Sequence, residues 1–282
     1  MSDAATLNNN NNDNGHGNGA AGVQRPMLEL RGIGKSFGGL KVIDDLSFKV
    51  MPSERVALIG PNGAGKTSAF NLVSGLYAVD TGSVILDGTD ITNVPSRKRI
   101  SYGLARTFQN IRLMSQLTVL ENVMLGQSAA AGSFAGMLQP VNLLRSNRWR
   151  EQARAELQAA GLSQYEKFPA GELPYGIQKR VELVRALLAR PRMLLLDEPA
   201  AGLNPTETNE LRAHLERIAE AGTTLLVVEH NMHFVGALCR RVLVLNFGQL
   251  IADCSPGVAQ ADPRVREAYL GRDHDLAREH AA

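Results

Sequence analysis

The distribution of apolar residues along the chain predicts strands of two kinds. Leu28-Glu29-Leu30 and residues 42–50 alternate apolar and polar positions, which is typical of strands with one face in solvent. Residues 56–59, 193–196 and 223–228 are dominated by apolar side chains, as expected of strands covered on both faces. The folded part of the chain is therefore expected to begin with half-exposed strands and to continue with the strands of a buried parallel sheet.

Helical spacing of apolar residues separates these strands. A helix is predicted after residue 67, a helical region from about 117 to 189, and another helix over 205–221. A third apolar strand at 242–245 precedes a turn at 247–249 and a last polar helical stretch. The order strand, helix, helical insert, strand, helix, strand predicts an α/β core interrupted by a helical subdomain.

The two ends of the chain differ in composition from the rest. Residues 1–26 are rich in Asn and Gly and include an unbroken Asn run at 8–12, which predicts a disordered tail. The folded domain is expected over residues 27–271, followed by a C-terminal tail over 272–282.

Charge and cysteine content narrow the class of protein. The 30 basic and 28 acidic residues leave a net charge of +2, far from the strongly basic surface of a dedicated nucleic-acid-binding protein. The 2 cysteines, Cys239 and Cys254, are too few for a disulfide framework and fit a reducing compartment. No apolar run approaches the ~18 residues that a membrane span requires, and the N-terminus lacks the layout of a signal peptide. We therefore expect a cytoplasmic protein that partners hold at any membrane where it works.

One motif indicates a nucleotide site. Residues 60–67 read Gly-Pro-Asn-Gly-Ala-Gly-Lys-Thr, a complete G-x-x-x-x-G-K-[ST] phosphate loop that follows the apolar run 56–59. Glycines allow the backbone to surround a triphosphate closely, Lys66 supplies a positive charge, and Thr67 offers a hydroxyl to Mg²⁺. The predicted helix directs its positive end at the phosphates. The residues expected to bind ATP here are Gly60, Asn62, Gly63, Gly65, Lys66, Thr67 and Ser68.

Two further apolar strands end in side chains suited to phosphoryl transfer. Asp197 and Glu198 follow one strand, and His230 ends the next one along the chain. Because ligands of an open α/β sheet bind at the carboxyl ends of its strands, Asp197 is expected to bind Mg²⁺, directly or through water. Glu198 is expected to orient or deprotonate the attacking water. His230 could reach the γ-phosphate, although a histidine in such a place could equally satisfy local hydrogen bonds.

Gln109 stands where the strand pattern gives way to the helical region. There it could contact Mg²⁺ or water and transmit that contact to the helical insert, so we treat it as a candidate catalytic residue and metal ligand. A loop glutamine is otherwise commonly exposed to solvent. The other histidines receive no role because they lie on predicted helices or in the predicted tails.

The order and spacing of these motifs resemble those of the ABC family of transport ATPases. The phosphate loop, Gln109, Asp197-Glu198 and His230 correspond to its Walker A loop, Q-loop, Walker B motif with catalytic glutamate, and switch histidine. The resemblance implies a P-loop NTPase (RecA-like) core with an antiparallel β subdomain and an inserted helical subdomain at about 110–189. It also implies that Phe37 stacks on adenine, although a single aromatic residue is more often part of a core.

Four stretches of the sequence resemble one subfamily more closely, the larger ATPase of branched-chain amino acid importers. The matching stretches are 106–113, 118–124, 197–208 and 268–271. This resemblance implies a peripheral subunit on the cytoplasmic face of the inner membrane that pairs with a second ATPase. Two permease subunits would dock on the pair and receive Leu, Ile or Val from a solute-binding protein. The exposed segment around residues 112–114 would meet a permease, unless its apolar side chains pack into a core.

Two other functions use a similar cassette. One is the ATPase of another ABC system, such as an importer of a different solute or a lipopolysaccharide exporter. The sequence of residues 106–110 argues against the exporter. The other is a soluble cassette protein of translation or DNA repair. Such proteins usually carry two cassettes or a long coiled-coil insert, and this chain has neither.

The signature loop departs from the family pattern. ABC proteins read Leu-Ser-Gly-Gly-Gln and the importer subfamily reads Leu-Ser/Ala-Tyr-Gly-Gln-Gln, whereas residues 173–178 read Leu-Pro-Tyr-Gly-Ile-Gln. Tyr175 and Gly176 fit the resemblance and are expected to contact the nucleotide of the partner ATPase. Pro174 removes a hydroxyl and a backbone N–H at a place where the family's loop donates to a γ-phosphate. We hypothesise that the site completed for the partner is impaired, while this chain's own site hydrolyses ATP. Alternatively, Pro174 merely starts the following helix.

That helix, expected over 176–190, has an apolar and a basic face. The face predicted to be buried carries Ile177, Val181, Val184 and Leu188, and the face predicted to be solvated carries Lys179, Arg180 and Arg185.

Overall fold

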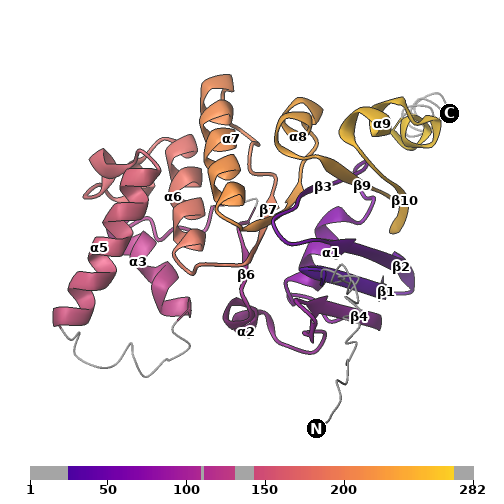
Figure 1. The fold of residues 1–282 in the computed structure, drawn as a ribbon, viewed down its shortest axis with the longest axis horizontal. Coiled ribbons are helices and arrows are strands. Elements are labelled where there is room, and N and C mark those ends of the chain that lie inside the picture. Colours follow the sequence, from indigo (N-terminus) through magenta and orange to yellow (C-terminus); the bar gives the residue numbers. More distant parts are fainter. Residues whose placement is uncertain (1–24, 109–110, 131–142, 270–282) are drawn as a thin grey trace, which may run out of the picture.

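The computed structural model describes residues 25–108, 111–130 and 143–269, which form two sheets and a group of helices (Figure 1). The larger sheet has the strand order β10-β9-β3-β8-β7-β6. Its parallel strands are β3 (Arg55–Ile59), β6 (Leu104–Arg106), β7 (Met193–Asp197), β8 (Thr224–Val228) and β9 (Arg241–Asn246). The edge strand β10 (Gln249–Cys254) runs antiparallel to β9.

The smaller sheet is antiparallel, with the order β2-β1-β4-β5. Its strands are β1 (Leu28–Phe37), β2 (Leu40–Val50), β4 (Thr81–Leu86) and β5 (Thr89–Asp90). Alternate residues of β2 are buried, as the sequence pattern predicts for a strand with one face in solvent.

The central strands are uniformly apolar because both faces of the larger sheet are covered. Met193 and Leu195 of β7 pack in one core cluster, together with Phe70 of α1 (Lys66–Val73) and the inner face of the smaller sheet. Leu194 and Leu196 pack in a second cluster on the other face. The helices of that second face are α7 (Pro205–Glu220), α8 (Met232–Leu238) and α9 (Pro256–Ala261).

The helical insert has a core of its own. Its helices are α3 (Val119–Ala130), α5 (Leu143–Ala159) and α6 (Tyr175–Leu187), and they lie at the opposite end of the molecule from the smaller sheet (Figure 1). Val181 and Val184 are fully buried in its core cluster, with Ile177 and Leu188 packed against it. This confirms the predicted apolar face of α6. A short helix α2 (Ser96–Arg99) with the 3-10 turn Ile100–Tyr102 connects the smaller sheet to β6.

The α/β architecture is confirmed, and one element differs from the expectation. Residues after Phe247 were expected to form a turn and a polar helix, whereas Gln249–Cys254 form strand β10 before α9 begins. Phe247 and Gly248 both have positive φ, 45° and 77°, and therefore form the tight turn of a hairpin.

Some predicted features lie outside the described residues. These are Gln109, most of the N-terminal tail and the whole C-terminal tail. Among the residues that the structure does describe, no helix is long and apolar enough to cross a membrane.

Candidate active site

The phosphate loop connects β3 to α1 at the carboxyl end of the larger sheet. Its glycines are required by space as well as by backbone angle: Gly60 has φ 149°, and a Cβ on it would lie 2.2 Å from the carbonyl oxygen of Leu245. Gly63 and Gly65 have φ values of 76° and 101°. Helix α1 has no side-chain cap and no acidic residue in its first turn. The positive end of α1 therefore faces the loop with no anionic side chain of its own there.

Lys66 lies across this loop. Its Nζ donates hydrogen bonds to the carbonyl oxygens of Gly60 at 2.7 Å and Pro61 at 2.9 Å, and the residue is half-buried. Thr67 and Asn62 are exposed and Ser68 is half-buried. The loop thus collects an ammonium group, hydroxyls and backbone N–H groups in one place, the donor set that recognises phosphate oxygens.

Asp197 ends β7 and forms a buried ion pair with Arg106. Arg106 Nη2 donates to Asp197 Oδ2 at 2.7 Å, and the two side chains are 8% and 5% exposed. Arg106 Nη1 also donates to Asn71 Oδ1 at 2.7 Å and Ser74 Oγ at 2.8 Å, both from α1 or its C-cap. Its Nε has no hydrogen-bond partner within the described structure. Arg106 therefore links β6, β7 and the phosphate-binding helix.

Glu198 and His230 follow the adjacent strands β7 and β8 and meet at the sheet edge. His230 Nδ1 lies 4.0 Å from Glu198 Oε1, with side chains 66% and 25% exposed. Glu198 has a left-handed backbone, φ 46°, and its N–H donates to the carbonyl oxygen of Val228 at 2.9 Å. Positive φ is uncommon for a residue with a Cβ and is found at functional sites that the surrounding structure holds in place.

Phe37 ends β1 with its ring partly exposed. It is 42% exposed, and its centroid lies 5.3 Å from that of Tyr77 in an edge-to-face arrangement. Lys35 Nζ lies 5.3 Å from the Phe37 ring and pairs with Asp80 at 2.6 Å. The ring is therefore not part of a core and offers a face to a planar ligand.

Tyr175 and Gly176 begin α6 and lie against Gly202 and Glu207, at the start of α7 and in the chain that leads into it. Tyr175 is 46% exposed, and its ring fills the space where a Cβ of Gly202 would be, 2.9 Å from the nearest ring atom. Gly176 is buried, and a Cβ there would lie 2.4 Å from the Glu207 carboxylate. Pro174 is the N-cap of α6, consistent with the alternative that it starts this helix.

The prediction that the basic face of α6 is solvated is wrong. Lys179 is only 7% exposed and Arg185 is half-buried. Arg180 is also half-buried and reaches Glu210 on α7 at 2.6 Å. The cause is that α6 packs on two sides: its apolar face meets the helical core, while the loop after β7 covers the side that bears Lys179.

Sequence reasoning missed three charged residues around the site: Arg106, Lys179 and Glu229. Glu229 is 1% exposed and accepts hydrogen bonds from three backbone N–H groups, Ala200 at 2.8 Å, His230 at 3.1 Å and Asn231 at 3.4 Å. A signal existed for Arg106 and Glu229, since each is a charged residue at the carboxyl end of a short apolar strand.

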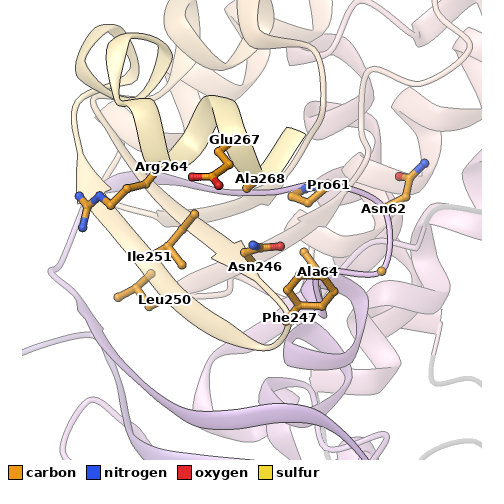
Figure 2. A pocket seen from close by; sticks show the side chains of 11 residues that line it. Pro61, Asn62, Ala64, Asn246, Phe247, Leu250, Ile251, Arg264, Glu267 and Ala268 are labelled. Atoms are coloured by element: carbon orange, nitrogen blue, oxygen red, sulfur yellow. The ribbon is translucent and has the colours of Figure 1, made fainter. Parts of the chain in front are cut away.

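A pocket of about 550 Å³ lies behind the phosphate loop, between that loop, the β9–β10 turn and the helical residues 263–269 (Figure 2). Pro61, Asn62 and Ala64 form one wall, and Glu267 projects toward the pocket from the helical segment. Nearby, burial raises the pKa of Tyr269, and a hydrogen bond with the backbone of Gly60 opposes that rise. The C-terminal segment therefore contacts the first residue of the phosphate loop.

The residues at the loop fit Mg²⁺ only together with a nucleotide. Among the described residues, no group of three or more His, Cys, Asp or Glu side chains could hold a metal ion. Thr67 supplies a hydroxyl and Asp197 a carboxylate, and Mg²⁺ is commonly bound by one or two such oxygens together with substrate phosphates.

Family models match two parts of the chain. Residues 43–201 match the model described as "ABC transporter", and residues 249–275 match that described as "Branched-chain amino acid ATP-binding cassette transporter". The second match covers β10, α9 and the segment that carries Tyr269.

Characterised relatives cover nearly the same length. The chain is 39% identical over 253 residues to the high-affinity branched-chain amino acid transport ATP-binding protein BraF of Pseudomonas aeruginosa, covering 88% of this chain and 99% of BraF. It is 37% identical over 256 residues to LivG of Escherichia coli, with the same coverage. It is 32% identical over 250 residues to the lipopolysaccharide export ATP-binding protein LptB of Haemophilus influenzae, covering 89% of this chain and 99% of LptB.

The solved structures that superpose on this chain are also cassettes of ABC transporters. The ADP conformation of MJ1267, an ATP-binding cassette of an ABC transporter, superposes with a TM-score of 0.77 at 33% identity, covering 87% of this chain and 99% of that one. A nucleotide-free cassette of an ABC transporter also gives 0.77 at 31% identity, covering 86% and 98%. The chain therefore belongs to the ABC transporter family, as an ATPase subunit that powers transport across a membrane.

Proposed function

We propose that this chain is the larger ATPase subunit of an importer for branched-chain amino acids. The observation that carries the catalytic part is the placement of Glu198 and His230, 4.0 Å apart beyond adjacent strands of the sheet that ends in the phosphate loop. The solute is supported by the C-terminal family match at 249–275 and by the higher identity to BraF and LivG than to LptB.

ATP binds with its phosphates in the loop and its adenine against Phe37. Gly60, Gly63 and Gly65 bring backbone N–H groups to the phosphate oxygens. Lys66 exchanges its two carbonyl partners for β- and γ-phosphate oxygens, which carry more charge. Asn62 and Ser68 add polar contacts at the two ends of the loop.

Hydrolysis uses the side chains beyond β7 and β8. Glu198 orients the attacking water and accepts its proton, and His230 donates to the γ-phosphate from the neighbouring strand. Gln109, which lies outside the described residues, contacts Mg²⁺ or water and transmits that contact to the helical insert. Thr67, Asp197 and Gln109 would hold Mg²⁺, which would supply positive charge to the phosphate oxygens. Tyr175 and Gly176 complete the nucleotide site of the partner ATPase.

The partners are a second ATPase subunit, two permease subunits and, through them, a solute-binding protein, with the ATPases at the cytoplasmic face of the inner membrane. A groove of about 380 Å³ between α2, β6, α3 and α6 suits a permease helix. Its lining combines apolar side chains such as Phe108 and Leu125 with the cations Arg97 and Arg185. Met114, in the segment expected to meet a permease, is 56% exposed.

The second candidate is lipopolysaccharide export, which the 32% identity to LptB over almost its whole length favours. Both candidates predict the same ATP chemistry and differ only in what the permeases carry. Uptake measurements therefore separate them.

The test is uptake of labelled Leu, Ile and Val, beside unrelated solutes, in cells that lack the gene. Complementation should succeed with wild type and with the exposed-lysine control Lys49→Ala, and should fail with Lys66→Ala and Glu198→Gln. Loss of lipopolysaccharide at the cell surface with unchanged uptake would support export instead. Full activity of Lys66→Ala and Glu198→Gln would refute the catalytic assignment itself.

A further inference from the structure

Lys179 is a buried cation whose hydrogen bonds within the described residues go to backbone carbonyl oxygens and to no carboxylate. Its Nζ donates to the carbonyl oxygens of Glu198 at 2.8 Å, Pro199 at 3.3 Å and Ala201 at 2.8 Å. The residue is 7% exposed, and its Nζ also lies 5.4 Å from the Tyr175 ring. One ammonium group thus binds three carbonyl oxygens of the same four-residue loop, residues 198–201.

The same loop is held from its other side by Glu229. This carboxylate accepts the N–H of Ala200 through Oε1 at 2.8 Å. Its Oε2 accepts the N–H of His230 at 3.1 Å and of Asn231 at 3.4 Å. Glu229 therefore joins the loop that carries Glu198 to the loop that carries His230, the two residues whose side chains face each other.

Lys179 and Glu229 hold the loop in a conformation that is energetically unfavourable for the loop by itself. Glu198 has φ 46°, and such a backbone costs about 1–3 kcal/mol for a residue with a Cβ and persists only where neighbouring groups fix it. Lys179 binds the carbonyl of that strained residue, and the Val228 carbonyl binds its N–H. Both the N–H and the carbonyl of Glu198 are therefore held by hydrogen bonds.

A role in fold stability alone does not account for this arrangement. Burying an ammonium and a carboxylate in a protein interior is costly, and apolar side chains of similar volume often stabilise as well or better. The burial lowers the pKa of Lys179, with the negative charges of Glu229, Glu182, Glu198 and Asp197 opposing that change. What an apolar side chain could not supply is the orientation of three carbonyl oxygens and, through them, of Glu198.

We propose that Lys179 and Glu229 are positioning residues for hydrolysis, which together hold the 198–201 loop so that Glu198 faces His230. The inference rests on the proposed catalytic role of Glu198. It also assigns a function to α6 within this chain's own site, in addition to the contact that Tyr175 and Gly176 make with the partner's nucleotide.

The experiment measures ATP hydrolysis by the assembled transporter carrying Lys179→Met. We expect kcat to fall roughly tenfold to a hundredfold, the range that a displacement of about 1 Å produces, while KM for ATP stays within about threefold. The matched control is Arg180→Met, the next basic residue of α6, which contacts Glu210 and the Ala160 carbonyl and not the loop. Its kcat should remain at the wild-type value.

A second measurement distinguishes the positioning of Glu198 from a general loss of structure in the variant. In a Glu198→Gln background, single-turnover hydrolysis should show no further loss on adding Lys179→Met, because the residue acts through Glu198. Glu229→Gln keeps the side-chain shape, tests the loop from its other side, and carries the test if Lys179→Met does not fold. It should also lower kcat with little change in KM.

Three results would overturn the inference: unchanged kcat in Lys179→Met and Glu229→Gln, an equal loss in Arg180→Met, or the full loss repeated in the Glu198→Gln background. If Glu198→Gln is inactive while Lys179→Met turns over normally, only this inference fails. If Glu198→Gln itself turns over normally, the proposed catalytic role fails first.

Discussion

Arg99 fixes the far end of the phosphate-binding helix, and its removal should destabilise the protein strongly. The residue is 2% exposed and its guanidinium donates to four carbonyl oxygens. Those of Leu72 at 3.0 Å and Val73 at 2.6 Å belong to the last turn of α1, and those of Thr92 at 3.1 Å and Val94 at 2.9 Å to the segment before α2. The positive charge also sits at the negative end of the α1 dipole.

The expected loss for Arg99→Met follows from these contacts. The bonds to Leu72 and Val73 are fully buried, and an unsatisfied buried carbonyl costs about 1–3 kcal/mol. The bonds to Thr92 and Val94 are only partly buried, so water replaces them at small cost. A favourable interaction with the helix dipole of up to about 1 kcal/mol is also lost. Burial of the guanidinium, which lowers the pKa of Arg99 to about 10, offsets part of this sum. We expect a net loss of about 3 kcal/mol.

The assay is urea unfolding of the isolated chain, read as the free energy of unfolding at constant m-value. The matched control is Lys98→Met, the preceding basic residue of α2, which is exposed and should change stability by less than about 0.5 kcal/mol. A loss below about 1 kcal/mol for Arg99→Met, or one no larger than that of Lys98→Met, would refute the reasoning that carbonyl satisfaction at this helix end stabilises the fold.

Three further predictions concern pH, a turn and the signature loop. Burial and the charges of Arg217 and Arg180 lower the pKa of His214 from 6.5 to about 4, so the unfolded chain binds more protons between these values and stability falls as pH drops through that window. Between pH 7 and 5 the free energy of unfolding, measured in urea, should fall by about 2 kcal/mol more for wild type than for His214→Gln. An equal fall in the two proteins would contradict this. Gly248→Ala should cost at least about 3 kcal/mol because its Cβ would lie 2.3 Å from the Val42 carbonyl oxygen, whereas Gly222→Ala, also at positive φ but with nothing within 4 Å, should cost about 1–2. Equal losses of stability for the two variants in thermal unfolding would show that the backbone angle alone determines the cost of each substitution. Pro174→Ser in the assembled complex should raise ATP turnover by restoring a hydroxyl at the N-cap of α6, and unchanged turnover would leave the proline as a helix start only.

The predictable part of the fold is the part that periodicity determines. Strands β3, β7, β8 and β9 are apolar runs of the right length, and α7 begins at the Asn204 capping box with proline at its first position. Strand β10 was not predicted because none of its 6 residues is fully buried, and because a Phe-Gly pair is not a typical hairpin turn sequence.

The phosphate loop and the residues after β7 and β8 could be predicted because their chemistry is local to one motif. The surroundings of Glu198 could not be predicted in the same way. Lys179 occupies the side of α6 that helical periodicity assigns to solvent, and only the tertiary contact with residues 198–201 buries it. Which face of a helix a loop covers depends on chain connectivity that a periodic pattern does not contain.

Lys66, Arg99 and Lys179 share one mode of contact, since each donates to main-chain carbonyls where a helix or strand ends. Carbonyls at such ends have no partner in regular structure, and a buried cation can satisfy several at once. The three differ in access to solvent: Lys66 is half-buried, whereas Arg99 and Lys179 are 2% and 7% exposed. Only Lys66 is therefore placed to exchange carbonyls for an incoming phosphate. The two buried cations keep their partners, so α1 and the 198–201 loop retain their shape while Lys66, the first residue of α1, changes what it binds.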